Sequence, residues 1–283
     1  MQHKQRFTNV TLVTPYGEED KDLLIDSDKI VDILNPNENI SDDWKIIDGQ
    51  NNFIFPGMID VLQHGFLNYL YGHAEENCTV DNSKILPSVG VTGFLPSTPC
   101  LPPEKTKTLL NALSNDIDKA KEGARVLGIH SEGPCFALPG AHDPKNLRNP
   151  SVSLAEELLD ACQGKLKALT LAPEMNGSEE FIKRLKKEKI SIHLGHSGAN
   201  PIDVPKFADW GVDAVTHMYD ALPTYPPDDT GVHVLSLTDA LIAETRIALG
   251  VICDGIHVHP QLVELLSHLP TAVSYTHLRA HET

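Results

Sequence analysis

Three consecutive segments, ARVLGIHSEG (residues 124–133), LAEELLDACQG (154–164) and KALTLAPE (167–174), decide the fold of this chain. The first and third are short and rich in aliphatic residues, as buried strands are, and the second has a composition typical of a helix. A strand, a helix and a second strand in this order predict parallel strands joined by a crossover helix.

The same alternation runs along most of the chain. We expect further strands at 57–65, 84–98, 190–197, 213–221 and 246–258, where the range 84–98 begins with the end of a helix. Further helices are expected at 103–123, 178–189, 202–211, 238–245 and 260–269. The predicted fold class is therefore α/β, a TIM (β/α)8-type barrel. It is incomplete, because about seven βα units are present where a closed barrel of this type needs eight.

The first 55 residues differ from the rest of the chain in composition and periodicity. RFTNVTLVT (6–14) is rich in β-formers, PYGEED (15–20) is typical of a turn, and no helical period persists before Pro56-Gly57. Residues 1–55 are predicted to form the N-terminal part of a small β-sandwich domain, and residues 56–271 the barrel.

The C-terminal segment 272–283 contains VSYTHLRAHET, which looks like the translated read-through of a sequencing adapter. We predict a non-native tail there and exclude it from the fold, so that His277 and His281 are not ligand candidates. The alternative is a genuine polar tail. On the first interpretation the barrel stops before its eighth strand.

Three of the predicted strands end in a side chain that can bind a metal ion. VLGIHSEG places Glu132, SIHLGHSGA places His196 and AVTHMYDA places His217. A barrel builds its site from the C-terminal ends of its strands, so these residues are expected to converge. One carboxylate and two imidazoles suit a catalytic zinc ion. Taken singly, a histidine after an apolar strand is more often a hydrogen-bonded core or rim residue than a ligand, and Glu132 could be a structural carboxylate that caps the next helix.

Composition excludes several classes of partner. The 283 residues are 41% hydrophobic and carry a formal net charge of −16, with no basic block suited to nucleic acid. No stretch approaches the length of a membrane span, and the N-terminus lacks the apolar core of a signal peptide. The five cysteines are scattered and without a CxxC pair, which favours the reducing cytoplasm.

Taken together, eight segments resemble one family, the N-acetylglucosamine-6-phosphate deacetylases of the amidohydrolase superfamily. In chain order they are PGMIDVLQHG, VTGFLPST, GIHSEGPCF, PGAHDP, LTLAPE, GHSGA, THMYDAL and GVICDGIHV, within about residues 50 to 265. The resemblance implies a TIM barrel beside a β-sandwich assembled from both chain ends.

The resemblance also implies roles for individual residues. Glu132, His196 and His217 would hold one divalent metal ion per subunit, zinc in the first place, with iron or another ion as alternatives. Hydrolysis would convert N-acetylglucosamine 6-phosphate to glucosamine 6-phosphate and acetate, in amino-sugar catabolism. The full-length protein would be a homodimer. The residues expected to bind the substrate are Ala141, His142, Asp220, Ala221, Asp254, Gly255, Ile256 and His257.

The sequence departs from the family pattern in three places. Leu62 stands where the family often has the first histidine of an HxH pair, which leaves His64 to orient a neighbour or contact the rim. Asp220 replaces an asparagine, and Asp228 and Asp229 stand where the family presents an arginine to the sugar phosphate. The family's general acid/base is an aspartate of the eighth strand, and no residue matches it, so no catalytic residue is assigned.

Three functions therefore remain open. The first is deacetylation of the phosphorylated amino sugar, with this particular chain inactive. The second is deacetylation of a non-phosphorylated N-acyl sugar or another N-acyl compound. The third is an inactive fragment or ligand-binding homologue.

Overall fold

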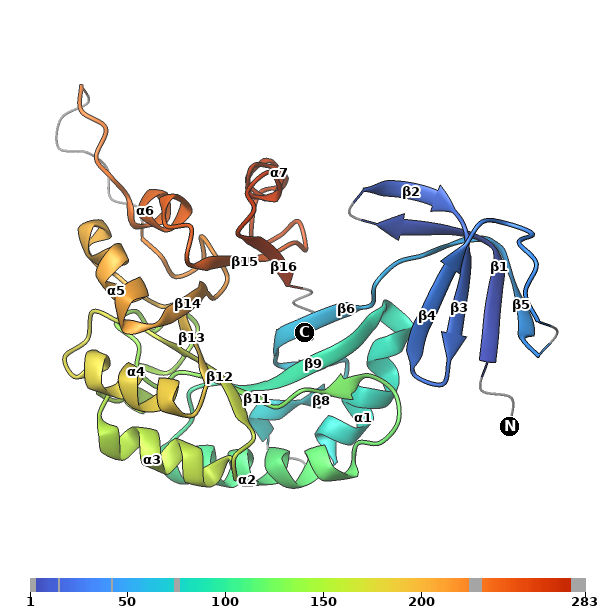
Figure 1. Ribbon diagram of the computed structural model, residues 1–283. Helices are drawn as coiled ribbons and strands as arrows, with labels where there is room; N and C mark the ends of the chain where they lie inside the picture. The colour runs from blue at the N-terminus through green and yellow to red at the C-terminus, as the bar shows by residue number, and fades with distance from the viewer. Residues whose placement is uncertain (1–3, 15, 42, 74–76, 224–230, 276–283) are drawn as a thin grey trace. The chain divides into compact units, whose positions relative to one another are not determined.

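The computed structural model describes residues 4–14, 16–41, 43–73, 77–223 and 231–275, and the chain forms two compact units, Met1–Gly57 and Met58–Thr283. Figure 1 labels their elements, and each unit is described by itself.

The N-terminal unit is one five-stranded sheet. Strands β2, β1, β3 and β4 pair antiparallel in that order, while β5 lies parallel to β1. Val10, Leu12 and Leu23 form its small core. The strands span Lys4–Thr14 (β1), Gly17–Asp20 (β2), Asp22–Asp26 (β3), Lys29–Leu34 (β4) and Lys45–Ile54 (β5). The predicted small β portion ahead of the barrel is confirmed.

The second unit is built on a curled parallel sheet. Its strands follow one another as β9, β11, β12, β13, β14, β15 and β16, while β6 and the short β10 pair with β9. Sequential parallel neighbours are what strand–helix alternation produces. The strands span Met58–Gln63 (β6), Val91–Thr98 (β9), Arg125–Val126 (β10), Ile129–Glu132 (β11), Leu166–Leu171 (β12), Ser191–Leu194 (β13), Val212–Val215 (β14), Ala248–Ile252 (β15) and Ala272–Tyr275 (β16). The predicted incomplete barrel is confirmed.

The last strand extends the sheet beyond residue 271, the predicted end of the barrel. β16 pairs parallel with β15, from Leu249 opposite Ala272 to Ile252 opposite Tyr275. In the described part of the chain no ladder joins β16 to β6, so the sheet stays open at that point. Residues 276–283, the rest of the expected tail, lie outside the described residues.

Helices connect the strands, and Figure 1 shows α2, α3 and α4 along the convex side of the sheet. Two small antiparallel strands, β7 (Gly65–Phe66) and β8 (Tyr69–Leu70), follow β6. The α-helices span Cys78–Ile85 (α1), Pro103–Lys119 (α2), Val152–Ala161 (α3), Ser178–Lys187 (α4), Val204–Trp210 (α5), Leu237–Ala243 (α6) and Pro260–Ser267 (α7). The 3-10 turns span Tyr71–His73 (η1), Leu86–Val89 (η2), Pro144–Asn146 (η3) and Pro201–Asp203 (η4). None of the described helices combines the length and apolar composition that a membrane crossing requires.

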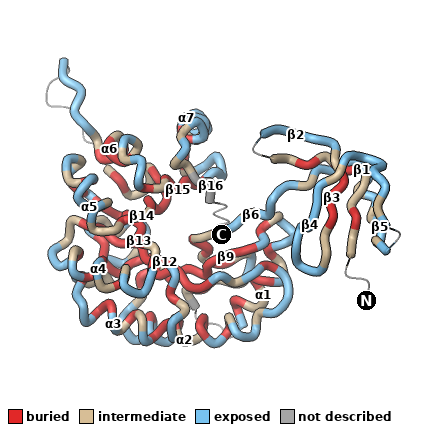
Figure 2. The backbone as a smooth tube through the Cα atoms, in the orientation of Figure 1, coloured by how far each residue is buried: buried red, intermediate tan, exposed pale blue. Residues whose placement is uncertain are grey.

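Helix α4 illustrates how the sequence sets these elements. Glu179 and Glu180 occupy its first turn and Arg184, Lys186 and Lys187 its last, so that both ends complement the helix dipole. The helix buries Leu185 together with Phe181 and Ile182, which lie four and three residues before it on the same helix face. Figure 2 shows the resulting pattern, in which buried residues concentrate on the strands and exposed ones on the outer helix faces.

Candidate metal centre

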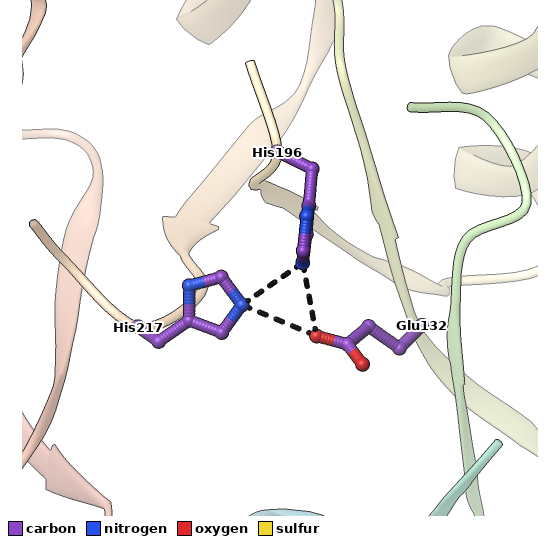
Figure 3. Close-up of side chains that lie close together, drawn as sticks. All are labelled: Glu132, His196 and His217. Atoms are coloured by element: carbon purple, nitrogen blue, oxygen red, sulfur yellow. Dashed lines mark hydrogen bonds and ion pairs between the residues drawn. The ribbon is translucent and has the colours of Figure 1, made fainter. Parts of the chain in front are cut away.

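The three predicted ligands meet at the carboxyl ends of the parallel strands, each after its own strand. Glu132 ends β11, while His196 and His217 lie two residues beyond β13 and β14. His217 Nε2 is 3.2 Å from Glu132 Oε1 and 3.2 Å from His196 Nε2, and His196 Nε2 is 3.5 Å from Glu132 Oε1. Figure 3 shows the two rings and the carboxylate pointing at one another. All three residues are buried.

The loop that follows β11 holds His196 in place through hydrogen bonds. Ala137 and Leu138 both donate backbone N–H groups to the His196 carbonyl, at 3.1 and 2.9 Å. In return, His196 Nδ1 lies 3.1 Å from the Leu138 carbonyl. A carbonyl only accepts, so Nδ1 carries the hydrogen and the neutral ring directs the lone pair of Nε2 at Glu132. Such a backbone contact is the usual way in which a ligand imidazole is oriented.

Both histidines of the cluster have left-handed backbone conformations, with φ of 52° at His196 and 35° at His217. Residues other than glycine seldom adopt this region, and such strain concentrates at functional sites. The surrounding hydrogen bonds therefore hold both side chains at an energetic cost.

Two further imidazoles contact the second oxygen of Glu132. His64 Nε2 is 3.1 Å and His142 Nε2 is 3.4 Å from Glu132 Oε2. His64 Nδ1 lies 3.2 Å from the Ser97 carbonyl and so donates to it. His64 therefore contacts the carboxylate of Glu132, and its Nε2 donates a hydrogen bond there only when both ring nitrogens carry a hydrogen.

His142 has the opposite tautomer. The backbone N–H of Cys100 donates to His142 Nδ1 at 3.4 Å, so in the neutral ring the hydrogen is on Nε2. His142 therefore donates toward the site, whereas His196 presents a lone pair to it.

Charge in the site is set by this ring of imidazoles. Burial alone would raise the pKa of Glu132, but His64, His142, His196 and His217 together hold that pKa well below its ordinary value. Burial lowers the pKa of His196. The site thus pairs an anionic carboxylate with a neutral imidazole at pH 7, the protonation states that metal binding requires.

The arrangement fits a divalent metal ion. One ligand atom from each of Glu132, His196 and His217 lies within 4.8 Å of the others, and no second such group occurs among the described residues. Two imidazole nitrogens 3.2 Å apart that face one carboxylate oxygen are satisfied by a cation at their centre. This donor set suits zinc and other borderline ions.

The residues expected to bind the substrate fall into two groups. In the first, His142 contacts Glu132, and Ala141 follows Gly140, whose added Cβ would lie 3.7 Å from the Ala221 Cβ. Asp220 and Ala221 belong to the segment that carries His217, where the Asp220 N–H donates to the His217 carbonyl at 2.9 Å.

The second group is a turn formed by Asp254, Gly255, Ile256 and His257. The Asp254 carboxylate accepts the N–H groups of Ile256 and His257 at 2.8 and 3.0 Å and contacts His257 Nδ1 at 2.6 Å. Burial would raise the pKa of Asp254, but these three contacts hold that pKa at about 2. Within the described part of the chain, no hydrogen bond or ion pair joins this turn to the metal ligands. Asp228 and Asp229 lie outside the described residues.

Glu174, which ends the segment KALTLAPE, is a further residue of the site that was not predicted. Its carboxylate accepts the Ser197 hydroxyl and the Gly198 N–H, both at 2.8 Å, and so anchors the residues that follow His196. The criterion that found Glu132, an acidic residue at a strand end, would also have found Glu174. The backbone carbonyls of Ser97 and Leu138 had no sequence signal.

No protein-family profile matches the chain. It is 29% identical to the N-acetylglucosamine-6-phosphate deacetylase of Danio rerio over 272 residues, which cover 92% of this chain and 66% of that protein. It is 32% identical to the enzyme of that name from Bacillus subtilis over 225 residues, 76% of this chain and 54% of the relative. The chain thus spans less than two thirds of the length of these curated relatives.

Solved structures agree. The crystal structure of N-acetylglucosamine-6-phosphate deacetylase from Thermotoga maritima is 29% identical, with a TM-score of 0.77 over 96% of this chain and 70% of that one. The corresponding structure from Pasteurella multocida is 25% identical, with a TM-score of 0.84 over 96% and 71%. The fold and the strand-end Glu-His-His cluster define an amidohydrolase-type barrel with a divalent metal site. More narrowly, the chain is similar over most of its length to N-acetylglucosamine-6-phosphate deacetylases.

Proposed function

We propose that this protein hydrolyses the N-acetyl amide of an amino sugar, releasing acetate and a free amine, with N-acetylglucosamine 6-phosphate as the substrate. The observation that carries the proposal is the buried convergence of Glu132, His196 and His217. The names of the relatives in fish and bacteria support the same reaction and a place in amino-sugar catabolism.

In the proposed enzyme Glu132, His196 and His217 hold one divalent ion, for which we propose zinc. When bound, such an ion acts as a Lewis acid, which activates water at neutral pH and polarises a carbonyl.

The protein's own groups have separate tasks around this centre. Glu132 stays anionic, because four imidazoles surround it. His142 directs its Nε2–H toward the site, and we propose that this group donates a hydrogen bond to the oxygen of the acetyl group. Ala141, Asp220, Ala221 and the turn from Asp254 to His257 are proposed to contact the sugar.

No general base is assigned among the residues of the metal centre that the structure describes. β16, with the sequence AVSY, lies next after β15 in the sheet and contains no acidic residue. Loss of a general acid/base commonly lowers the rate by about 10² to 10⁴. We therefore expect this chain to bind metal and sugar and to turn over slowly at most.

The second candidate is a sugar without phosphate. The sequence has Asp228 and Asp229 where the resemblance leads one to expect an arginine, and carboxylates repel a phosphate that arginine would bind. This candidate differs from the first only in the group attached to the sugar.

One experiment separates these possibilities. Acetate release from N-acetylglucosamine, with and without the 6-phosphate, is measured with the zinc-loaded chain and with Glu132→Gln, while calorimetry measures binding of the same sugars. Release that disappears in Glu132→Gln supports the enzyme, and the preferred sugar identifies the substrate. Binding without release identifies a ligand-binding homologue, and neither result with either sugar refutes the proposal.

We also propose a cytoplasmic location and a homodimer. All five cysteines are free, four of them buried, which suits a reducing compartment. The homodimer rests on the family resemblance alone, and sedimentation of the purified chain tests it.

A further inference from the structure

A line of hydrogen bonds crosses the barrel interior, formed by side chains that the metal site does not use. His130 Nδ1 lies 2.6 Å from the Val61 carbonyl, and His130 Nε2 lies 2.8 Å from the Thr170 hydroxyl. The Thr170 hydroxyl in turn lies 2.7 Å from the Thr216 hydroxyl. His130, Thr170 and Thr216 are at most 1% exposed.

The chemistry of the end group fixes the direction of this line. The Val61 carbonyl can only accept, so His130 Nδ1 must donate to it. Nε2 of the neutral ring is then an acceptor, which obliges the Thr170 hydroxyl to donate to the ring. With its one hydrogen used, the Thr170 oxygen accepts from Thr216. The hydrogens therefore all point from Thr216 through Thr170 and His130 to Val61.

The line joins strands that carry the proposed metal ligands. His130 lies two residues before Glu132 on β11, and Thr216 lies immediately before His217 at the end of β14. Thr170 belongs to β12, and Val61 lies on β6, three residues before His64.

Gly195 lets the two hydroxyls meet. It directly precedes His196 at the end of β13, the strand between β12 and β14. A Cβ added there would lie 2.7 Å from Thr170 Cγ2 and 3.2 Å from Thr216 Cβ, so a side chain would push the threonines apart. The hydrogen bond between Thr170 and Thr216 thus passes over the backbone at the end of β13, the strand that leads to His196.

We propose that His130, Thr170 and Thr216 are positioning residues, which set the spacing of the strands that carry Glu132 and His217 and thereby the geometry of the metal site. A fully satisfied buried network of fixed direction has one arrangement, which makes it suited to hold two ligands in register. This inference rests on the metal site proposed above.

The contrasting interpretation is that the three residues only fill the core. Removal of one hydroxyl would then lower stability and leave metal binding as it is. Outer partners that orient ligands typically change metal affinity by about 10- to 100-fold when they are lost. Zinc affinity therefore separates the two interpretations.

The experiment measures zinc dissociation constants by chelator competition, and the absorption spectrum of the cobalt-substituted chain, for Thr170→Val and Thr216→Val. Thr106→Val is the matched control, because Thr106 is also a buried threonine whose hydroxyl donates a hydrogen bond, to the Leu101 carbonyl at 3.0 Å, but near the start of α2. We expect each variant of the line to weaken zinc binding by about 10- to 100-fold and to shift the cobalt spectrum. Thr170→Ser, which keeps the hydroxyl, should restore both. An equal effect of Thr106→Val, or no effect in Thr170→Val and Thr216→Val, overturns the proposal.

A second measurement requires neither metal nor substitution. Nitrogen NMR of the unaltered chain should show a neutral His130 with hydrogen on Nδ1 and none on Nε2, and the opposite tautomer overturns the proposed direction. If the unaltered chain binds no zinc but shows this tautomer, the metal site fails and the line of hydrogen bonds stands.

Discussion

Two buried carboxylates on strands of the same sheet have pKa values that are shifted in opposite directions. Glu132 at the end of β11 is surrounded by four imidazoles, and its pKa lies well below the ordinary value. Asp60 on β6 has one backbone N–H, from Leu62 at 3.1 Å, and among the described residues its Oδ2 has no hydrogen-bond partner. Burial raises the pKa of Asp60 to about 7, against the effects of Leu62 and His64.

The difference teaches that burial alone does not make a metal ligand. Both carboxylates lose water, which favours the neutral acid. Only at Glu132 do partners from several strands reverse that effect. Glu132 on β11 is thus an anion that can bind a cation. Asp60 on β6, in contrast, is close to the midpoint of its titration at neutral pH.

The largest effect is expected from the centre of the cluster. Glu132→Gln replaces the one anionic ligand of the cluster with a neutral amide. Zinc affinity should fall by more than about a hundredfold, beyond the range typical of outer partners. Chelator competition measures the change. Glu157→Gln, which removes a carboxylate paired with Arg148, is the control and should bind zinc normally.

The second-largest effect is expected at Gly195, which has no room for a side chain. Gly195→Ala places a methyl group 2.7 Å from Thr170 Cγ2, and overpacking of this kind costs about 1–3 kcal/mol. Denaturant unfolding measures the loss. Gly72→Ala, whose Cβ would meet only Pro99 Cγ at 3.8 Å, should cost much less, and equal losses would contradict the packing argument.

Asp60 should give a pH dependence of opposite sign to that of an ion-paired carboxylate. Its folded pKa of about 7 lies above the value of 3.8 for a free aspartate, so between these values the folded state holds a proton that the unfolded state has lost. This group's contribution to stability is present below the unfolded pKa and is lost as the pH rises toward 7, by up to about 1.4 kcal/mol per pH unit. Unfolding between pH 4 and 8 should show this slope, and Asp60→Asn should remove it. Exposed Asp160→Asn should leave it in place.

The smallest effect is expected at Asp254, a more exposed carboxylate held by neighbours in its own turn. Asp254→Asn weakens contacts to Ile256 and His257 that no metal ligand shares. Global stability should change by no more than about 0.5 kcal/mol, as for most surface substitutions. Faster amide exchange at residues 256 and 257 with unchanged zinc affinity would support this view, and a loss of zinc binding would show that the turn and the centre are coupled.

Some of this structure follows from local sequence. The alternating strands and helices were predictable, because each element's periodicity lies within its own segment. The metal trio was predictable because carboxyl ends of parallel strands share one edge, which turns Glu132, His196 and His217 into neighbours. Glu174 could have been found by the same rule.

The remaining features depend on contacts between distant segments. Nothing in the sequence FALPG (136–140) or in Ser97-Thr98 indicates that the Leu138 and Ser97 carbonyls contact the rings of His196 and His64. β16 was not expected, because its sequence resembled a tail, and a strand pairs wherever a neighbouring edge is open.

The sequence by itself determined the α/β class, the order of the strands and the three residues able to bind a metal ion, since these depend on residue type and spacing. Only the tertiary structure decided the state of each group. It made Glu132 an anion and Asp60 an acid, and it gave His142 the opposite tautomer to His196, because protonation depends on the partners that folding brings within hydrogen-bond distance.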